Sequence, residues 1–88
     1  MNLLIVEDDA VTRQVLAAQL RKLGHSVAEA DDGISGYERF REVHPEVVIT
    51  DWIMPRLDGP SLCRKIREGA NAAYTYLIIL TALEKKVG

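Results

Sequence analysis

The sequence feature that most constrains the fold is a short apolar run that ends in an aspartate. Residues 47–50 read Val-Val-Ile-Thr, and Asp51 follows directly. A loop containing Pro55 then leads to Asp58 and Gly59. A run of this kind between turn residues is typical of a buried strand in a parallel sheet, and such sheets carry their chemistry at the carboxyl ends of the strands. Asp51 is therefore a candidate nucleophile, a candidate metal ligand, or the cap of the next helix.

The composition is that of one small globular domain. The chain has 88 residues, of which 48% are hydrophobic and 27% are charged, and its formal net charge is −2. Because the cations are scattered, we expect no direct contact with nucleic acid. Charged residues interrupt every apolar run, which excludes a membrane span and a signal-peptide core and predicts a cytoplasmic protein. The one cysteine, Cys63, cannot close an internal disulfide, and its helical spacing beside Leu62 and Ile66 predicts a small core residue.

Apolar runs alternate with amphipathic segments along the chain. The runs predict strands over residues 2–6, 26–30, 47–51 and 76–81. The segments between them predict helices over about 10–23 and 34–43 and from Asp58 to just before Gly69, and residues 82–88 would begin a further helix. This βαβαβαβ alternation predicts a single α/β domain, with a doubly wound parallel sheet covered by helices and right-handed crossovers.

The first predicted helix has an apolar side and a polar side. Its apolar residues recur at Val15, Leu16, Leu20 and Leu23. This helical spacing predicts that they face the sheet. Arg13 lies among the polar residues, which we expect on the opposite side.

Acidic turn residues come just before the second and third helices. Asp31-Asp32-Gly33 makes a turn that can cap the second helix, and Asp58 suits the positive amino end of the third. Gly36 lies inside the second helix, where we expect it to cost roughly 1 kcal/mol relative to alanine.

Acidic residues follow two of the predicted strands. Because parallel strands point the same way, Glu7, Asp8, Asp51 and Thr81 should lie at one edge of the sheet. Both histidines precede strands and should lie at the opposite edge. Carboxylates gathered in this way repel one another unless a cation lies among them, and an all-oxygen site suits Mg²⁺. A bound divalent cation is therefore predicted.

Together these motifs resemble the receiver domain of two-component response regulators. The matching residues, in order, are Glu7-Asp8 after the first strand, Asp51 in Thr-Asp-Trp-Ile-Met-Pro, Asp58-Gly59, and Thr81-Ala82 after the fourth strand. The likeness extends over the whole chain. It implies a flavodoxin-like receiver fold, here with four strands in the order 2-1-3-4 and three helices.

The resemblance also implies a chemistry. In that family the aspartate at the position of Asp51 accepts a phosphoryl group from a phosphohistidine on a sensor histidine kinase or a phosphotransfer protein. Asp8 and Asp51 would bind Mg²⁺ directly, Glu7 would help mainly through water, and the backbone carbonyl of Ile53 would supply another ligand. Thr81 would hydrogen-bond the phosphoryl group and report its presence. The chain would be a signalling phosphoacceptor that assists its own phosphorylation, not a metabolic enzyme.

The sequence departs from the family pattern in two respects. The family has a lysine after a fifth strand, and Lys85 and Lys86 come too early in the sequence to match it. We therefore expect residues 1–88 to form a receiver domain that lacks most of helix four, strand five and helix five. Ile53 and Leu83 occupy positions that in the family tune phosphoryl hydrolysis. Both are apolar, which predicts a long-lived aspartyl phosphate.

A fourth strand without a neighbour would leave an apolar edge open. Such an edge invites pairing with another chain. We expect a homodimer through this edge. The alternative is that the sequence is a piece of a longer protein.

Other interpretations of the acidic residues stay open. A receiver fragment that is not phosphorylated and acts as a dimerising interaction module is the main alternative. Magnesium-dependent phosphatases also use an aspartate nucleophile, but they carry Asp-x-Asp after the first strand, and position 53 is isoleucine. Glu7, Asp8 and Asp9 could instead cap the first helix. Capping would explain Asp9 but not the pair before it.

Overall fold

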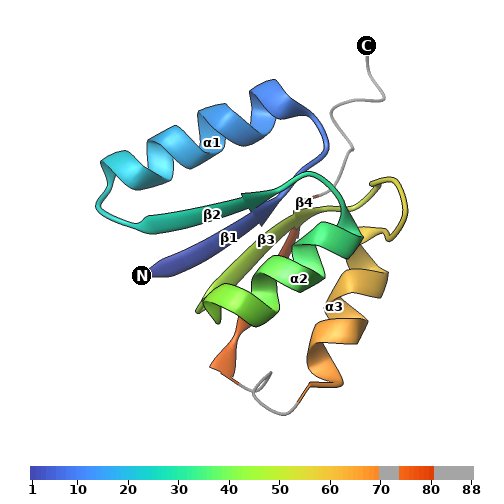
Figure 1. Cartoon of the computed structure of the whole chain (residues 1–88). Helices are drawn as coiled ribbons and strands as arrows, with labels where there is room; N and C mark the ends of the chain where they lie inside the picture. The colour runs from blue at the N-terminus through green and yellow to red at the C-terminus, as the bar shows by residue number, and fades with distance from the viewer. Residues whose placement is uncertain (70–73, 81–88) are drawn as a thin grey trace.

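The computed structural model describes residues 1–69 and 74–80, which form a four-stranded parallel sheet flanked by three helices (Figure 1). The strands are β1 (Asn2–Val6), β2 (Ser26–Ala30), β3 (Val47–Asp51) and β4 (Tyr76–Leu80), in the order β2-β1-β3-β4. The helices are α1 (Ala10–Lys22), α2 (Gly33–Val43) and α3 (Gly59–Arg67). The predicted strand order and parallel sheet are confirmed. The end predicted for the fourth strand at residue 81 and the helix predicted over 82–88 lie outside the described residues.

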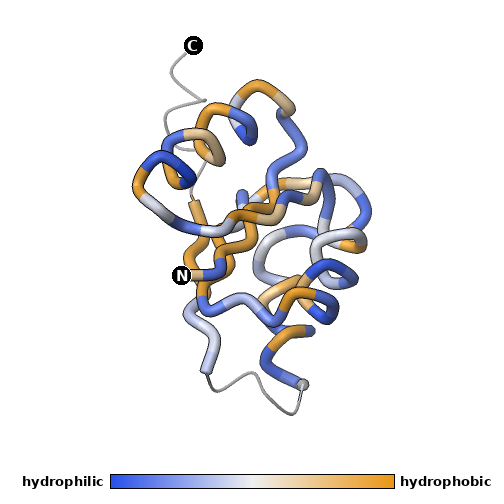
Figure 2. The backbone as a smooth tube through the Cα atoms, turned by 60° about the vertical axis from the view of Figure 1, so that its left-hand side comes forward, coloured by the Kyte–Doolittle hydropathy of each residue, from blue (hydrophilic) through white to orange (hydrophobic). Residues whose placement is uncertain are grey.

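The helices divide between the two faces of the sheet. In Figure 1, α1 lies alone on one side, and α2 and α3 lie together on the other. Figure 2 shows strongly hydrophobic strands at the centre, whereas the helices alternate between hydrophobic and hydrophilic positions. This is the pattern expected for a sheet buried on both faces. Among the described residues, no helix has the length and apolar character needed to cross a membrane.

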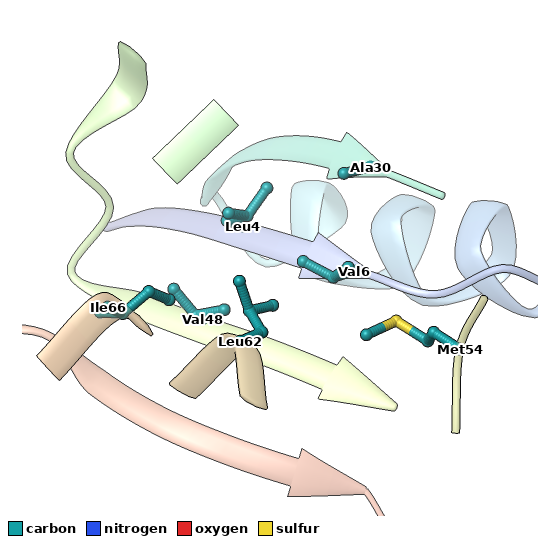
Figure 3. Packing of buried hydrophobic residues seen from close by; sticks show 7 residues of the cluster. All are labelled: Leu4, Val6, Ala30, Val48, Met54, Leu62 and Ile66. Atoms are coloured by element: carbon teal, nitrogen blue, oxygen red, sulfur yellow. The ribbon is translucent and has the colours of Figure 1, made fainter. Parts of the chain in front are cut away.

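The main core lies between the sheet and the α2–α3 pair. Leu4 and Val48 from the strands and Leu62 and Ile66 from α3 are fully buried. Figure 3 shows the side chains of Leu62 and Ile66 close to Val48. Burying an aliphatic side chain of this size contributes about 1.5–3 kcal/mol. Cys63 is only partly buried and lies outside this cluster, so its predicted place in the core was wrong.

The buried side of α1 agrees with the predicted one only in part. Leu16 and Leu20 are half-buried as predicted, but the fully buried residue is Ala17, and Val15 and Leu23 are exposed. The small alanine side chain lets the helix lie close to the sheet. Arg13, expected on the polar side, is mostly buried, with 16% of its side chain exposed.

Gly36 has a packing role that its helix propensity does not indicate. A Cβ atom added there would lie 2.9 Å from both Cγ atoms of Val6. Val6 is fully buried and its branched side chain has little rotational freedom. The glycine therefore allows α2 to contact β1 closely, which offsets its cost to the helix.

Candidate functional site

Three carboxylates lie together at the carboxyl edge of the sheet. Glu7 and Asp8 follow β1, and Asp51 is the last residue of β3. One carboxylate oxygen from each of the three lies within 4.8 Å of the others. Glu7 is only 5% exposed and Asp51 only 3%, whereas Asp8 is exposed. The sequence predicted this grouping from the strand order.

The other predicted site residues have different outcomes. Thr81 lies outside the described residues. Ile53 lies in the loop after β3 with its side chain largely exposed. The ligand role of its carbonyl stays a prediction. Neither His25 nor His44 belongs to the acidic group. Each precedes a strand, as the topology predicts.

Backbone hydrogen bonds hold Asp51 and the residue after it. The Trp52 N–H donates to Asp51 Oδ1 at 2.9 Å and to the carbonyl of Leu80 at 3.1 Å. The Trp52 carbonyl accepts from the N–H of Gly59 at 2.9 Å. A Cβ atom on Gly59 would lie 2.3 Å from the carbonyl oxygen of Asp51. The start of α3 therefore requires glycine, because it packs directly on the backbone of the candidate site.

Glu7 is also held at several points. Its N–H donates to the carbonyl of Ala30 at 3.0 Å, and its Oε2 accepts from the N–H of Asp9 at 2.9 Å. Its carbonyl accepts from Nη1 of Arg13 at 2.8 Å. Asp9 in turn caps α1, with Oδ2 accepting from the N–H of Thr12 at 2.8 Å. The predicted division holds in the structure, because Asp9 caps the helix while Glu7 and Asp8 join Asp51.

An ion pair links the loop after β3 to α2. Arg56 Nη2 lies 2.7 Å from Asp32 Oδ2, and Arg56 Nε donates to the same oxygen at 2.9 Å. Asp32 caps α2, since its Oδ1 accepts from the N–H of Ser35 at 2.8 Å. Desolvation by itself would raise the pKa of Asp32. The hydrogen bonds from Ser35 and the Arg56 guanidinium outweigh it, so the pKa is lowered.

Sequence reasoning missed two of these contacts. Arg13 was expected to face solvent, and Arg56 showed no pattern at all. Neither contact can be inferred from one sequence alone. Arg13 binds Glu7, which lies before the helix, and Arg56 binds Asp32, which lies 24 positions away. An arginine six residues after an acidic strand end is the one signal that could have been noticed.

The donor set fits a hard divalent cation. All three groups offer oxygen, the ligand atom that Mg²⁺ and Mn²⁺ prefer in proteins. Two of the three are buried, where crowded negative charge is costly without an opposite charge. The exposed Asp8 leaves one side of the site accessible to water.

The fold and the site define a class of protein, namely a flavodoxin-like α/β domain with acidic residues at the carboxyl edge of its sheet. The family model for the response regulator receiver domain matches residues 3–87. The chain therefore belongs to the response regulator receiver domain family, which confirms the resemblance found in the sequence.

Curated relatives agree with this assignment. The transcriptional regulatory protein CseB of Streptomyces coelicolor is 43% identical over 67 residues, which cover 76% of this chain and 29% of CseB. The probable transcriptional regulator ycf27 of Guillardia theta is 40% identical over 82 residues, covering 93% of this chain and 31% of that protein. The chain thus spans about three tenths of the length of these two relatives.

Solved structures show the same fold. The receiver domain of the sensor histidine kinase PA1611 from Pseudomonas aeruginosa is 36% identical, with a TM-score of 0.86 over 92% of this chain and 66% of that one. It is described with a magnesium ion coordinated in its active-site cleft. The chemotaxis response regulator CheY4 of Vibrio cholerae gives a TM-score of 0.87 at 25% identity, covering 99% of this chain and 76% of that one.

Proposed function

We propose that this chain is a phosphoacceptor domain of two-component signalling. Asp51 takes a phosphoryl group from a phosphohistidine of a sensor histidine kinase or a phosphotransfer protein, with Mg²⁺ as cofactor. The observation that carries the proposal is the grouping of Glu7, Asp8 and Asp51 within 4.8 Å in a chain of the receiver family. The magnesium described in the PA1611 receiver domain supports it.

Each acidic residue has a distinct proposed role in binding the cation. Asp8 and Asp51 bind the cation directly, Glu7 acts mainly through water, and the carbonyl of Ile53 adds a ligand. When bound, Mg²⁺ supplies positive charge against the carboxylates and against the charge that develops on the phosphoryl oxygens. The burial of Glu7 and Asp51 supports these parts, since a water-poor site strengthens each charge interaction.

Asp51 forms the covalent bond to the phosphoryl group. A carboxylate oxygen forms the new P–O bond while the P–N bond of the phosphohistidine breaks, and the leaving nitrogen keeps the electron pair. The Trp52 N–H on Oδ1 fixes the orientation of the carboxylate at the sheet edge. Phosphoryl transfer depends mainly on such positioning and on charge neutralisation. Thr81 is proposed to donate a hydrogen bond to the transferred group.

The outcome of this step is a switch rather than turnover of a metabolite. Phosphorylation of a side chain adds about −1.5 to −2 of charge at pH 7. Charge of this size can bias a loop that has two arrangements. We therefore infer a signalling role in the cytoplasm, without direct contact between this chain and nucleic acid.

Phosphorylation with a small-molecule donor tests the proposal. The wild-type chain and Asp51→Asn are incubated with an acyl phosphate and Mg²⁺, and intact mass is measured. We expect one added phosphoryl group on the wild type, dependent on Mg²⁺, and none on Asp51→Asn. An unchanged wild-type mass, or equal labelling of both proteins, would overturn the proposal.

A second candidate function is a dimerising interaction module that is not phosphorylated. It is favoured by one observation, that among the described residues β4 is the last strand of the sheet, with Tyr76, Ile78 and Leu80 exposed. An open strand with apolar side chains is a template for pairing with a second copy. Absence of labelling together with a stable dimer would favour this function.

A further inference from the structure

We propose that Arg13 is a positioning residue for the metal-binding acids. It holds the peptide group between Glu7 and Asp8, so that both carboxylates are directed to the cation before the cation binds. The inference rests on the proposed function, because it assumes that these acids bind a divalent ion.

The contacts of Arg13 join three segments of the chain. From the first turns of α1, Nη1 donates to the Glu7 carbonyl at 2.8 Å and Nε donates to Glu29 Oε1 at 3.2 Å. Glu29 belongs to β2, and Glu7 connects β1 to α1. Only 16% of the Arg13 side chain is exposed, so these hydrogen bonds face little competition from water.

Because the peptide group is planar, the hydrogen bond from Arg13 to Glu7 also restricts the orientation of Asp8. The Glu7 carbonyl and the Asp8 nitrogen belong to one planar group. The Glu7 N–H is fixed by Ala30, at 3.0 Å, and its carbonyl by Arg13. With both ends of the residue held, the direction in which the chain enters Asp8 is fixed. A preorganised site of this kind loses less conformational freedom when it binds its ligand.

Charge and positioning predict opposite effects on metal binding. The guanidinium of Arg13 is positive and binds the carbonyl of Glu7, one of the metal-binding acids. By Coulomb repulsion it should therefore weaken the binding of a cation. If charge alone mattered, removing Arg13 would strengthen cation binding. If Arg13 positions the acids, its removal weakens cation binding despite the loss of repulsion.

Arg21 provides a matched control on the same helix. Its Nη2 donates to Glu29 Oε2 at 3.1 Å and to the carbonyl of Val27 at 2.8 Å. It therefore shares the helix, the charge, the acidic partner and the type of second acceptor with Arg13. It differs in that its carbonyl partner is Val27 of β2 and not Glu7, and in that 50% of its side chain is exposed against 16% for Arg13.

The experiment compares the wild type with Arg13→Gln, Arg13→Lys and Arg21→Gln. Mn²⁺ is titrated against the fluorescence of Trp52, which follows Asp51, and circular dichroism verifies the fold. We expect Arg13→Gln to weaken Mn²⁺ binding about tenfold, the scale of a lost outer-shell partner. Arg13→Lys keeps the positive charge but loses the planar guanidinium group that donates to two acceptors at once. It should therefore also weaken binding, whereas Arg21→Gln should bind as the wild type does.

A metal-free measurement gives a second readout. In the absence of cation, the amide resonances of Asp8 and Asp9 should shift in Arg13→Gln and not in Arg21→Gln. Unchanged or tighter Mn²⁺ binding by Arg13→Gln would overturn the proposal, as would equal weakening in Arg21→Gln. If the wild type binds no Mn²⁺, the proposed metal site fails and the role of Arg13 fails with it. If the wild type binds Mn²⁺ and Arg13→Gln binds it equally well, only the role of Arg13 fails.

Discussion

Ile53 is a large aliphatic side chain that is open to solvent close in sequence to Asp51. It is 67% exposed, two positions after a carboxylate that is itself almost fully buried. Hydrolysis of an aspartyl phosphate requires a water molecule aligned with the phosphorus. A bulky apolar group beside that approach hinders the water, so the side chain at this position should set the lifetime of the signal.

Replacing Ile53 by alanine should therefore shorten the life of the phosphorylated state. We expect Ile53→Ala to hydrolyse roughly threefold to tenfold faster, equivalent to at most about 1.4 kcal/mol of barrier. Decay of the phosphorylated mass after removal of the donor measures this rate. Tyr76→Ala is the matched control, because Tyr76 is similarly exposed, at 73%, and begins β4 far along the strand from Asp51. Equal decay in the wild type and Ile53→Ala would contradict the prediction.

Gly36 offers a second prediction at the residue scale. Helix propensity alone favours Gly36→Ala by about 1 kcal/mol. The added methyl would lie 2.9 Å from the Cγ atoms of Val6, and overpacking of this kind costs about 1–3 kcal/mol. We expect a net loss of about 1 kcal/mol in the free energy of unfolding, measured with urea.

A double-mutant cycle isolates the cause. In a Val6→Ala background the contact disappears, so Gly36→Ala should then be neutral or stabilising. A Gly36→Ala protein more stable than the wild type would show that α2 can shift without cost.

At the scale of elements, the loop after β3 is tied to α2 by one ion pair. Arg56 adopts a positive φ of 71°, a conformation that non-glycine residues seldom take. Its guanidinium binds the cap of α2 while Leu57 approaches Gly33. The loop that carries the Ile53 carbonyl is thereby held against a neighbouring helix.

This ion pair should give stability that depends on pH. The folded-state pKa of Asp32 lies below its ordinary value of 3.8, so the pair stabilises the fold above that pH. Its contribution is lost as the pH falls through the folded pKa. Since Arg56 is well exposed, we expect Arg56→Gln to cost only about 0.5–1 kcal/mol at pH 7. Unfolding in urea at a series of pH values measures the difference.

The difference in the free energy of unfolding between the wild type and Arg56→Gln should become smaller below pH 3.8. Arg39→Gln serves as control, because it breaks an exposed i,i+3 pair with Glu42 on α2 and leaves the cap intact. A constant gap at all pH values would argue against an electrostatic origin.

Most of the elements could be predicted because each depends on local pattern. The runs at residues 2–6, 26–30 and 47–51 are strands in the structure. Parallel pairing then brought Glu7, Asp8 and Asp51 to one edge without further information. The roles of Arg13 and Arg56 could not be predicted, because long side chains reach partners set by tertiary packing. The buried face of α1 was predicted only in part, since Leu16 and Leu20 are half-buried but the closest contact with the sheet is made at Ala17 and not at Val15 or Leu23.

At the scale of the molecule, the two sheet edges differ. β2 is covered by contacts with α1 and α2, whereas Tyr76, Ile78 and Leu80 of β4 are exposed. Apolar side chains on an edge strand favour association with a second chain. The proposed homodimer would place two copies of β4 at their interface.

Sedimentation equilibrium tests this association. We expect the wild type to dimerise at micromolar concentration. Ile78→Lys should weaken the dimer more than tenfold, an effect above about 1.4 kcal/mol, because it puts a charge in the contact. Val15→Lys is the control, since Val15 is exposed on α1, away from β4. A wild type that is entirely monomeric would contradict the prediction.

The hydrogen of the Trp52 amide is shared between Asp51 Oδ1, at 2.9 Å, and the carbonyl of Leu80, at 3.1 Å. Two acceptors therefore compete for a single proton. Conversion of the carboxylate into an acyl phosphate would withdraw electron density from the first acceptor and favour the second. Phosphorylation at the end of β3 would then strengthen the hydrogen bond to the end of β4, so that a change at Asp51 could reach β4 through the backbone itself.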